Sequence, residues 1–289
     1  MVYVRPLFEE THAVRPIVLA LCLAAHALLK LFFFSSIFQV HVAGKVFVMS
    51  QGLLTPVLLA GLVEWAVLVM IVMGVLGGLR ARDLGLERGL AYSAILIFIV
   101  LWGVLQGVTA AIGGFANGEI ALQSSNIRLM PLERIGLPLQ AVFGSGLIEE
   151  VLYRGFLLTQ VYLIAVRRQV HARAALVLAA GVSTLYFGIN HIPAGMRMGL
   201  NMQDLMMYVG HVSLVGLLFA TLYLRTGNLF VAAGAHALIN QPTALFAAPV
   251  DPALIVLVGV ACLLLSWPTL NRRIGLVFTI GAVEGRPAI

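Results

Sequence analysis

Residues 90–112 read LAYSAILIFIVLWGVLQGVTAAI and contain no charged side chain. Because a transmembrane helix needs about 20 mostly apolar residues, this stretch predicts a membrane span. The whole chain has the same character: 61% of its 289 residues are hydrophobic, 10% are charged, and the mean hydropathy is +1.02. A soluble domain carries about 25% charged residues. The composition therefore indicates a membrane protein and excludes a pair of soluble domains.

Other stretches of the chain meet the same criterion. Together they give eight expected spans, at residues 17–38, 53–79, 90–112, 137–165, 174–191, 209–224, 228–247 and 252–268. No ten-residue alternating pattern recurs, so helices are the expected spanning element. We therefore expect an all-α, polytopic transmembrane helix bundle of about eight spans.

The basic residues outside these spans are distributed unevenly. Of the 18 Lys and Arg residues, twelve lie on the side of the N-terminus, four lie on the opposite side, and Lys30 and Arg154 lie inside spans. Cytoplasmic segments of membrane proteins are enriched in Lys and Arg. We therefore expect a multi-pass protein of the cell membrane with both termini in the cytoplasm, which requires an even number of spans. This basic face explains the net charge of +6, so the lipid bilayer is an expected partner and nucleic acid is not.

Charged side chains inside a span cost about 2.5 kcal/mol or more, so each one needs a reason. The fourth span carries Glu149 and Glu150 side by side, and Arg154 follows Glu150 by four residues. Residues at i and i+4 are neighbours on a helix, so Arg154 can neutralise Glu150. Glu149 has no cation at helical spacing on its own span, which makes it the candidate general base. The alternative is a buried ion pair that only locks helix packing.

Two histidines accompany these carboxylates on other spans. His191 ends the fifth span, with Phe187 one turn before it, and the seventh span holds His236 and Asn240 on one helix face. Each feature alone is typical of a structural role.

The spacing of the fourth and fifth spans connects these features. Glu149 and His191 are each 21 residues from position 170, in the basic turn between the two spans. An antiparallel pair of helices would therefore place them at the same depth. This coincidence predicts one site formed by Glu149, His191, His236 and Asn240. His26, Lys30 and Glu64 in the first two spans are expected to have structural roles, with Lys30 pairing with Glu64 or extending to the interface.

Taken in order, the three motifs resemble those of the CPBP family, which comprises type II CAAX prenyl proteases and bacteriocin-processing and self-immunity proteins. The motifs are Glu149-Glu150-x-x-x-Arg154, Phe187-x-x-x-His191 and His236-x-x-x-Asn240, and no motif position is substituted. The resemblance covers about residues 137–245. It implies an intramembrane endopeptidase that acts on a peptide or membrane-protein substrate, for CAAX-type C-terminal processing or for peptide or bacteriocin maturation.

The resemblance also implies roles for the residues. Glu149 and His191 would activate a water for attack on the scissile carbonyl, and His236 with Asn240 would bind the developing oxyanion. Glu150 and Arg154 would position Glu149, and Phe187 would form a wall of the pocket.

Three parts of the chain follow from this assignment. Residues 1–136 would hold an amphipathic N-terminus and the first three spans, residues 137–247 the catalytic core of spans four to seven, and residues 248–289 the last span and a cytoplasmic tail.

Zinc is the alternative cofactor, with Glu149, His191 and His236 as ligands, because two histidines and a glutamate are a permissible catalytic zinc set. The HExxH motif is absent and the two histidines come from separate helices, so catalysis without a metal is favoured. A catalytically silent scaffold or immunity protein is the alternative that is not an enzyme, and a proton-coupled transporter is a third.

The charge bias bears on the substrate. The basic turn near residue 170 is expected to be cytoplasmic, which places Glu149 about 27 Å away, towards the outer half of the membrane. Prenylated tails are cytoplasmic. The substrate is therefore prenylated only if the helices extend past the bilayer into the cytoplasm.

Overall fold

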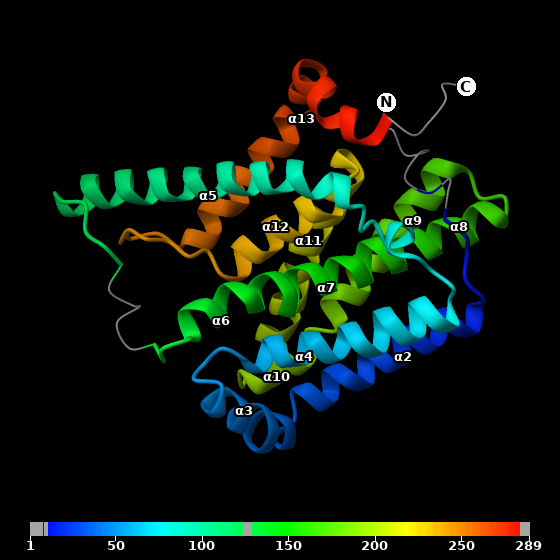
Figure 1. The fold of residues 1–289 in the computed structure, drawn as a ribbon, viewed down its shortest axis with the longest axis horizontal. Helices are drawn as coiled ribbons and strands as arrows, with labels where there is room; N and C mark the ends of the chain where they lie inside the picture. Colours follow the sequence, from blue (N-terminus) through cyan, green and yellow to red (C-terminus); the bar gives the residue numbers. More distant parts are fainter. Residues whose placement is uncertain (1–7, 9–10, 124–128, 284–289) are drawn as a thin grey trace.

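The computed structural model describes residues 8, 11–123 and 129–283, and this part of the chain contains helices and no β-strand (Figure 1). The expected all-α helix bundle is confirmed. The elements in chain order are α2 (Pro16–Phe33), the π-helical η1 (Ile37–Ala43), α3 (Gly44–Met49), α4 (Pro56–Glu64), the π-helical η2 (Trp65–Leu76), the 3₁₀ turn η3 (Ala81–Leu84), α5 (Arg88–Asn117), α6 (Glu133–Leu139), the π-helical η5 (Gln140–Gly146), α7 (Leu147–Glu150), the π-helical η6 (Val151–Leu158), α8 (Thr159–Arg167), α9 (Ala172–Ile189), α10 (Ile192–Arg197), α11 (Met202–Thr226), α12 (Leu229–Asn240) and α13 (Pro252–Val283).

Length and composition make several of these helical stretches able to cross a membrane. In the described residues there are seven: Pro16–Phe33, Pro56–Leu76, Ala81–Asn117, Glu133–Arg167, Ala172–Arg197, Met202–Thr226 and Pro252–Leu270. They correspond to seven of the eight expected spans. The chain is thus a multi-pass membrane protein.

The expected span at 228–247 differs from the other seven. Its helix α12 has only 12 residues, or about 18 Å, whereas the hydrocarbon core of a bilayer is about 30 Å thick. The helix begins beside the start of α5, where Asn228 Nδ2 donates to the Leu90 carbonyl at 2.8 Å. After α12 the chain is extended and reaches the far end of α5, where the Gln123 amide donates to the Leu245 carbonyl at 2.8 Å. The seventh crossing is therefore half a helix followed by an extended segment.

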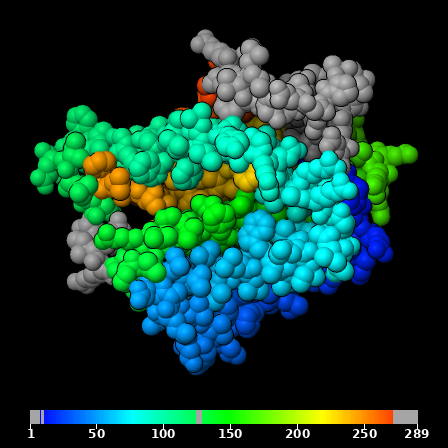
Figure 2. Space-filling model, viewed as in Figure 1, coloured from blue at the N-terminus to red at the C-terminus, as the bar shows by residue number. Residues whose placement is uncertain are grey.

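Local chemistry explains both halves of this crossing. The Asn228 side chain accepts from the Phe230 amide at 3.0 Å and so caps the start of α12. Pro242 disfavours helical backbone at the residue before it, and Gln241 accordingly leaves the helix with φ −142°. The Gln106 side chain of α5 then accepts from the Leu245 amide at 2.8 Å. Figures 1 and 2 show this segment in orange between α5 and α6.

The fourth and fifth spans form the expected hairpin. Helices α6 to α8 form a continuous helical stretch from Glu133 to Arg167, and α9 returns beside it after the turn at 168–171. Tyr162 and Ala165 pack against Ala175 and Ala179 near this turn. The hairpin places the central part of α7 next to the end of α9.

The first two spans pack directly against the fourth. Val18 of α2 and Leu68 of η2 share a buried apolar cluster with Val151 and Phe156 of η6. Helix α4 approaches η5 so closely that a Cβ atom on Gly61 would lie 2.5 Å from the Gly144 Cα atom. Only glycine at these positions allows the two backbones to touch.

The three expected parts of the chain remain a prediction. The amphipathic N-terminus falls mostly on residues 1–7 and 9–10, outside the described residues. At the other end, α13 continues as helix to Val283, where a tail was expected after residue 268.

Candidate active site

The two carboxylates lie at the centre of the fourth span. Glu149 and Glu150 end α7, a short α-helical stretch between the π-helical segments η5 and η6. Glu149 is 6% exposed and Glu150 is fully buried. Burying two carboxylates at this depth is unfavourable unless cations and hydrogen-bond donors lie close to them.

Arg154 compensates Glu150, as the spacing predicted. Its Nη1 atom donates to Glu150 Oε1 at 3.0 Å, and both side chains have no exposed surface. Its Nη2 atom donates to the Gly216 carbonyl of α11 at 2.6 Å. The guanidinium carbon also lies 4.8 Å from the Phe187 ring centre and 5.6 Å from the Phe219 ring centre, where aromatic faces attract a cation.

His236 of α12 contacts both glutamates. Its Nδ1 atom is 2.8 Å from Glu150 Oε1, and its Nε2 atom is 3.7 Å from Glu149 Oε2. Phe219 of α11 stacks on the imidazole, with ring centres 4.5 Å apart and planes 19° from parallel. The ring is thus held on two edges and one face.

His191 lies on the other side of Phe187. Its Nδ1 atom is 2.8 Å from the Phe187 carbonyl, so this nitrogen carries a proton and donates it to the carbonyl oxygen. The Phe187 ring centre is 4.6 Å from that of His191 and 5.8 Å from that of His236. Among the described residues, the ion pairs within 4.0 Å do not join His191 to Glu149. The hairpin brings His191 to Phe187 and, through this ring, close to the ring of His236.

Asn240 lies at the edge of this cluster. It follows His236 by one turn of α12, and its Nδ2 atom donates to Ser145 Oγ at 3.2 Å. Ser145 precedes Glu149 by four residues on the fourth span. Because Asn240 is exposed while His236 is 2% exposed, the pair connects the buried carboxylates to the surface.

A further cation in the site comes from the first span. Lys30 Nζ of α2 donates to Glu149 Oε1 at 3.0 Å and lies 3.5 Å from Glu64 Oε1 of α4. The expected pairing of Lys30 with Glu64 is confirmed, but Glu149 is its nearer partner. Glu149 lacks a cation on its own helix, as the spacing indicated, and gains one from another.

A comparison with protein-family models assigns part of the chain. Residues 131–241 match the model for the family described as type II CAAX prenyl endopeptidase Rce1-like. We refer to residues 131–241 as the Rce1-like domain because of this similarity. The domain is that of a peptidase family, in agreement with the family resemblance of the three motifs. No curated protein and no solved structure matches the chain.

The Rce1-like domain contains every motif residue, whereas Lys30 and Glu64 precede it. Neither was predicted as a site residue, and no motif marks them. The sequence offered one indication: a lysine inside a membrane span is energetically unfavourable unless a carboxylate lies near it. With Glu150 paired to Arg154, Glu64 and Glu149 were the remaining carboxylates in the spans.

The alternative zinc site does not fit these side chains. Glu149, His191 and His236 do not form a group that could hold a metal ion, and the described part of the chain contains no group of three or more His, Cys, Asp or Glu side chains that could. Lys30 already occupies one oxygen of Glu149 at 3.0 Å. An ammonium group at this distance repels a divalent cation.

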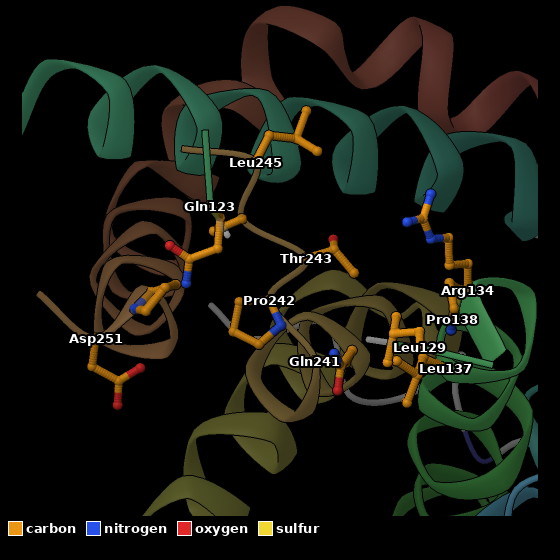
Figure 3. A pocket seen from close by; sticks show the side chains of 12 residues that line it. Gln123, Leu129, Arg134, Leu137, Pro138, Gln241, Pro242, Thr243, Leu245 and Asp251 are labelled. Atoms are coloured by element: carbon orange, nitrogen blue, oxygen red, sulfur yellow. The ribbon is translucent and has the colours of Figure 1, made fainter. Parts of the chain in front are cut away.

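An open pocket of about 450 Å³ adjoins the exposed end of the site (Figure 3). It lies between the start of the fourth span and the segment after Asn240. Gln241 and Thr243 line it, and Arg134 and Asp251 lie on opposite sides of it. A recess with both polar and apolar lining residues thus lies one residue beyond the last motif position.

Proposed function

We propose that this protein is an intramembrane endopeptidase in which Glu149 and His191 activate a water and His236 and Asn240 bind the oxyanion. The observation that carries the proposal is the contact of Glu149 and Glu150 with one imidazole, that of His236, at 3.7 and 2.8 Å. A structural ion pair would need only Arg154. The extra contacts orient His236 and Glu149 towards each other.

Water activation follows from the two groups with free lone pairs. The Nδ1 atom of His191 donates to the Phe187 carbonyl, so its Nε2 atom is the acceptor in the neutral ring. Lys30 holds Oε1 of Glu149, which leaves Oε2 as the basic oxygen. A water between these atoms loses a proton to Glu149 while its oxygen bonds to the carbonyl carbon. The C–N bond then breaks as that proton passes to the leaving nitrogen.

The oxyanion requires donors, and the contacts of His236 determine when it can be one. A carboxylate only accepts, so the Nδ1 atom of His236 carries the proton shared with Glu150. Its Nε2 atom donates only if the ring is an imidazolium.

We assign the oxyanion donor to the protonated ring of His236, whose two N–H groups would face Glu150 Oε1 and Glu149 Oε2 at 2.8 and 3.7 Å. Its Nε2–H then points at the same space as the Glu149 carboxylate. Asn240, one turn away, is the second donor, after rotation from its contact with Ser145.

We propose that the hydrolysis requires no cofactor. The ammonium group on Glu149 supports this choice, because a metal ion would have to displace it. Catalytic power then comes from preoriented donors, each worth about 3–4 kcal/mol.

The proposed substrate is a peptide or membrane protein that enters through the pocket beyond Asn240. Glu149 lies about 16 Å along the helix from Pro138 at this pocket, but about 27 Å from Arg167 at the basic turn. The path from the pocket to Glu149 is thus shorter than the path from the basic turn. The uneven distribution of Lys and Arg predicts that the basic turn lies on the cytoplasmic side of the cell membrane. With that orientation, the pocket opens away from the cytoplasm, and a prenylated cytoplasmic tail reaches the site less easily than a substrate from the opposite side.

The test is cleavage of prenylated and unprenylated peptide libraries by protein purified in detergent, with and without a strong chelator. We expect Glu149→Gln and His191→Ala to abolish cleavage and to leave a monodisperse protein. Glu87→Gln, at an exposed glutamate outside the site, is the matched control. Chelator inhibition reversed by zinc would overturn the metal-free mechanism. Biological function that survives both substitutions would favour a silent scaffold.

A further inference from the structure

Two membrane spans outside the Rce1-like domain contribute ionisable groups to its catalytic glutamate. Helix α2 carries His26 and Lys30, and α4 ends in Glu64. His26 is fully buried, Glu64 is 2% exposed, and the Lys30 side chain is 14% exposed. None of these positions belongs to residues 131–241.

We propose that Lys30 is a positioning residue for the reaction, holding Oε1 of Glu149 so that Oε2 faces His236 and the attacking water, with Glu64 as the counter-charge that shares Lys30. The proposal rests on the proposed function of Glu149 as the base. It assigns a catalytic purpose to the first two spans, which otherwise only pack against the domain.

The distances support unequal sharing of the ammonium group. Lys30 Nζ is 3.0 Å from Glu149 Oε1 and 3.5 Å from Glu64 Oε1. Three rotatable donors on an ammonium can satisfy both oxygens at once. Glu64 therefore weakens the hold of Lys30 on Glu149 without removing it, and Glu149 remains a carboxylate that can accept a proton.

The surrounding contacts fix the two helices that carry this pair. The close approach of Gly61 to Gly144 sets α4 against η5, five residues before Glu149. On the α2 side, the Tyr186 hydroxyl of α9 donates to the Leu23 carbonyl at 2.7 Å. Both spans are thus anchored to the hairpin that carries Glu149 and His191, so Lys30 approaches from a fixed direction.

His26 completes the enclosure of Glu64. Its Nε2 atom is 3.8 Å from Glu64 Oε1, and its Nδ1 atom is 3.3 Å from the Tyr186 hydroxyl. Glu64, which is 2% exposed, faces both Lys30 and His26 within 4.0 Å. Lys30 and Glu64 therefore act as a unit.

The experiment compares kcat and KM for Lys30→Met, Lys30→Arg and the double variant Lys30→Met with Glu64→Gln. We expect Lys30→Met to lower kcat about 100-fold, the loss that a misplaced reacting group typically causes, with little change in KM. Lys30→Arg keeps the charge and should recover most of kcat. Lys45→Met, at an exposed lysine of α3, is the control and should behave as the wild type.

The double variant addresses folding. It removes one cation and one carboxylate together, so it should unfold at nearly the temperature of the wild type while its kcat stays low. Wild-type kcat in the folded Lys30→Met variant, or in the folded double variant, overturns the proposal. So does a change confined to KM, which would make Lys30 a substrate-binding residue.

A separate measurement distinguishes failure of the proposal from failure of the proposed function. If the wild type cleaves no peptide, the thermal midpoints of Lys30→Met, Glu149→Gln and their combination are compared. Shifts that do not add confirm the pairing of Lys30 with Glu149 and leave only the peptidase function in question. Additive shifts overturn the positioning role.

Discussion

Replacement of Arg154 by methionine separates the structural and catalytic contributions of the buried charge cluster. The substitution Arg154→Met removes the donor to Glu150 Oε1 at 3.0 Å and the donor to the Gly216 carbonyl at 2.6 Å. Glu150 has no exposed surface, so its carboxylate would keep only His236 as a partner. Breaking a buried ion pair by removing one member typically costs about 3–5 kcal/mol. We expect a loss of unfolding free energy in this range.

The double variant Arg154→Met with Glu150→Gln should behave differently in stability and in activity. Replacing both members of a buried pair with uncharged groups is often neutral, so most of the stability should return. Activity should not return, because the 2.8 Å contact that orients His236 would be made to an uncharged amide oxygen in place of the Glu150 carboxylate. Loss of one oxyanion donor lowers kcat by about 100- to 1,000-fold.

The chain contains a natural reporter for the stability measurement. Cys22 of α2 is fully buried, whereas Cys262 is exposed. In a Cys262→Ser background, a thiol-reactive dye therefore labels the protein only as α2 separates from the bundle. The same preparations are assayed for peptide cleavage. Wild-type stability of Arg154→Met would refute the energetic argument, and a double variant with wild-type kcat would refute the role given to Glu150.

Three further predictions test other parts of the site. Asn240→Ala should lower kcat about 100-fold or more, because it removes an oxyanion donor. Ser145→Ala removes only the group to which Asn240 donates in this structure, so it should lower kcat less, and equal losses would contradict the role of Asn240. Gly61→Leu should destabilise the protein by about 1–3 kcal/mol, because its side chain would meet the Gly144 backbone; a wild-type thermal midpoint would contradict the close packing. Single cysteines at 168–171 should react with an impermeant thiol reagent only from the cytoplasmic side of intact cells, and labelling from outside would reverse the orientation.

Local spacing predicted the parts of the site that lie on single helices. The pairing of Glu150 with Arg154 required only that four residues separate them on a helix, and the structure has it at 3.0 Å. This inference succeeds because helical geometry converts residue numbers into positions. The equal depth of His191 and Glu149, inferred from the equal arms of the hairpin, stays a prediction.

Contacts between distant spans could not be predicted in the same way. Lys30 lies 119 residues from Glu149, and no spacing rule selects between Glu64 and Glu149 as its partner. The selection depends on how closely α4 approaches η5, which two glycines determine. The length of α12 was also missed, because hydropathy counts Phe246 and Ala247 as membrane residues whether they are helical or extended.

The extended half of the seventh crossing has a consequence for the supply of water. Backbone that is not helical carries unpaired amides and carbonyls, which at membrane depth are tolerated only when buried in protein or lining a water-filled cavity. Part of the segment after Asn240 is satisfied by protein, since Gln106 contacts Leu245 and Thr243. The rest lines the open pocket next to Asn240. The proposed hydrolysis consumes a water, and we infer that the recess beyond Asn240 supplies it to Glu149. The end of α12 at Asn240, one turn after His236, is therefore part of the proposed mechanism.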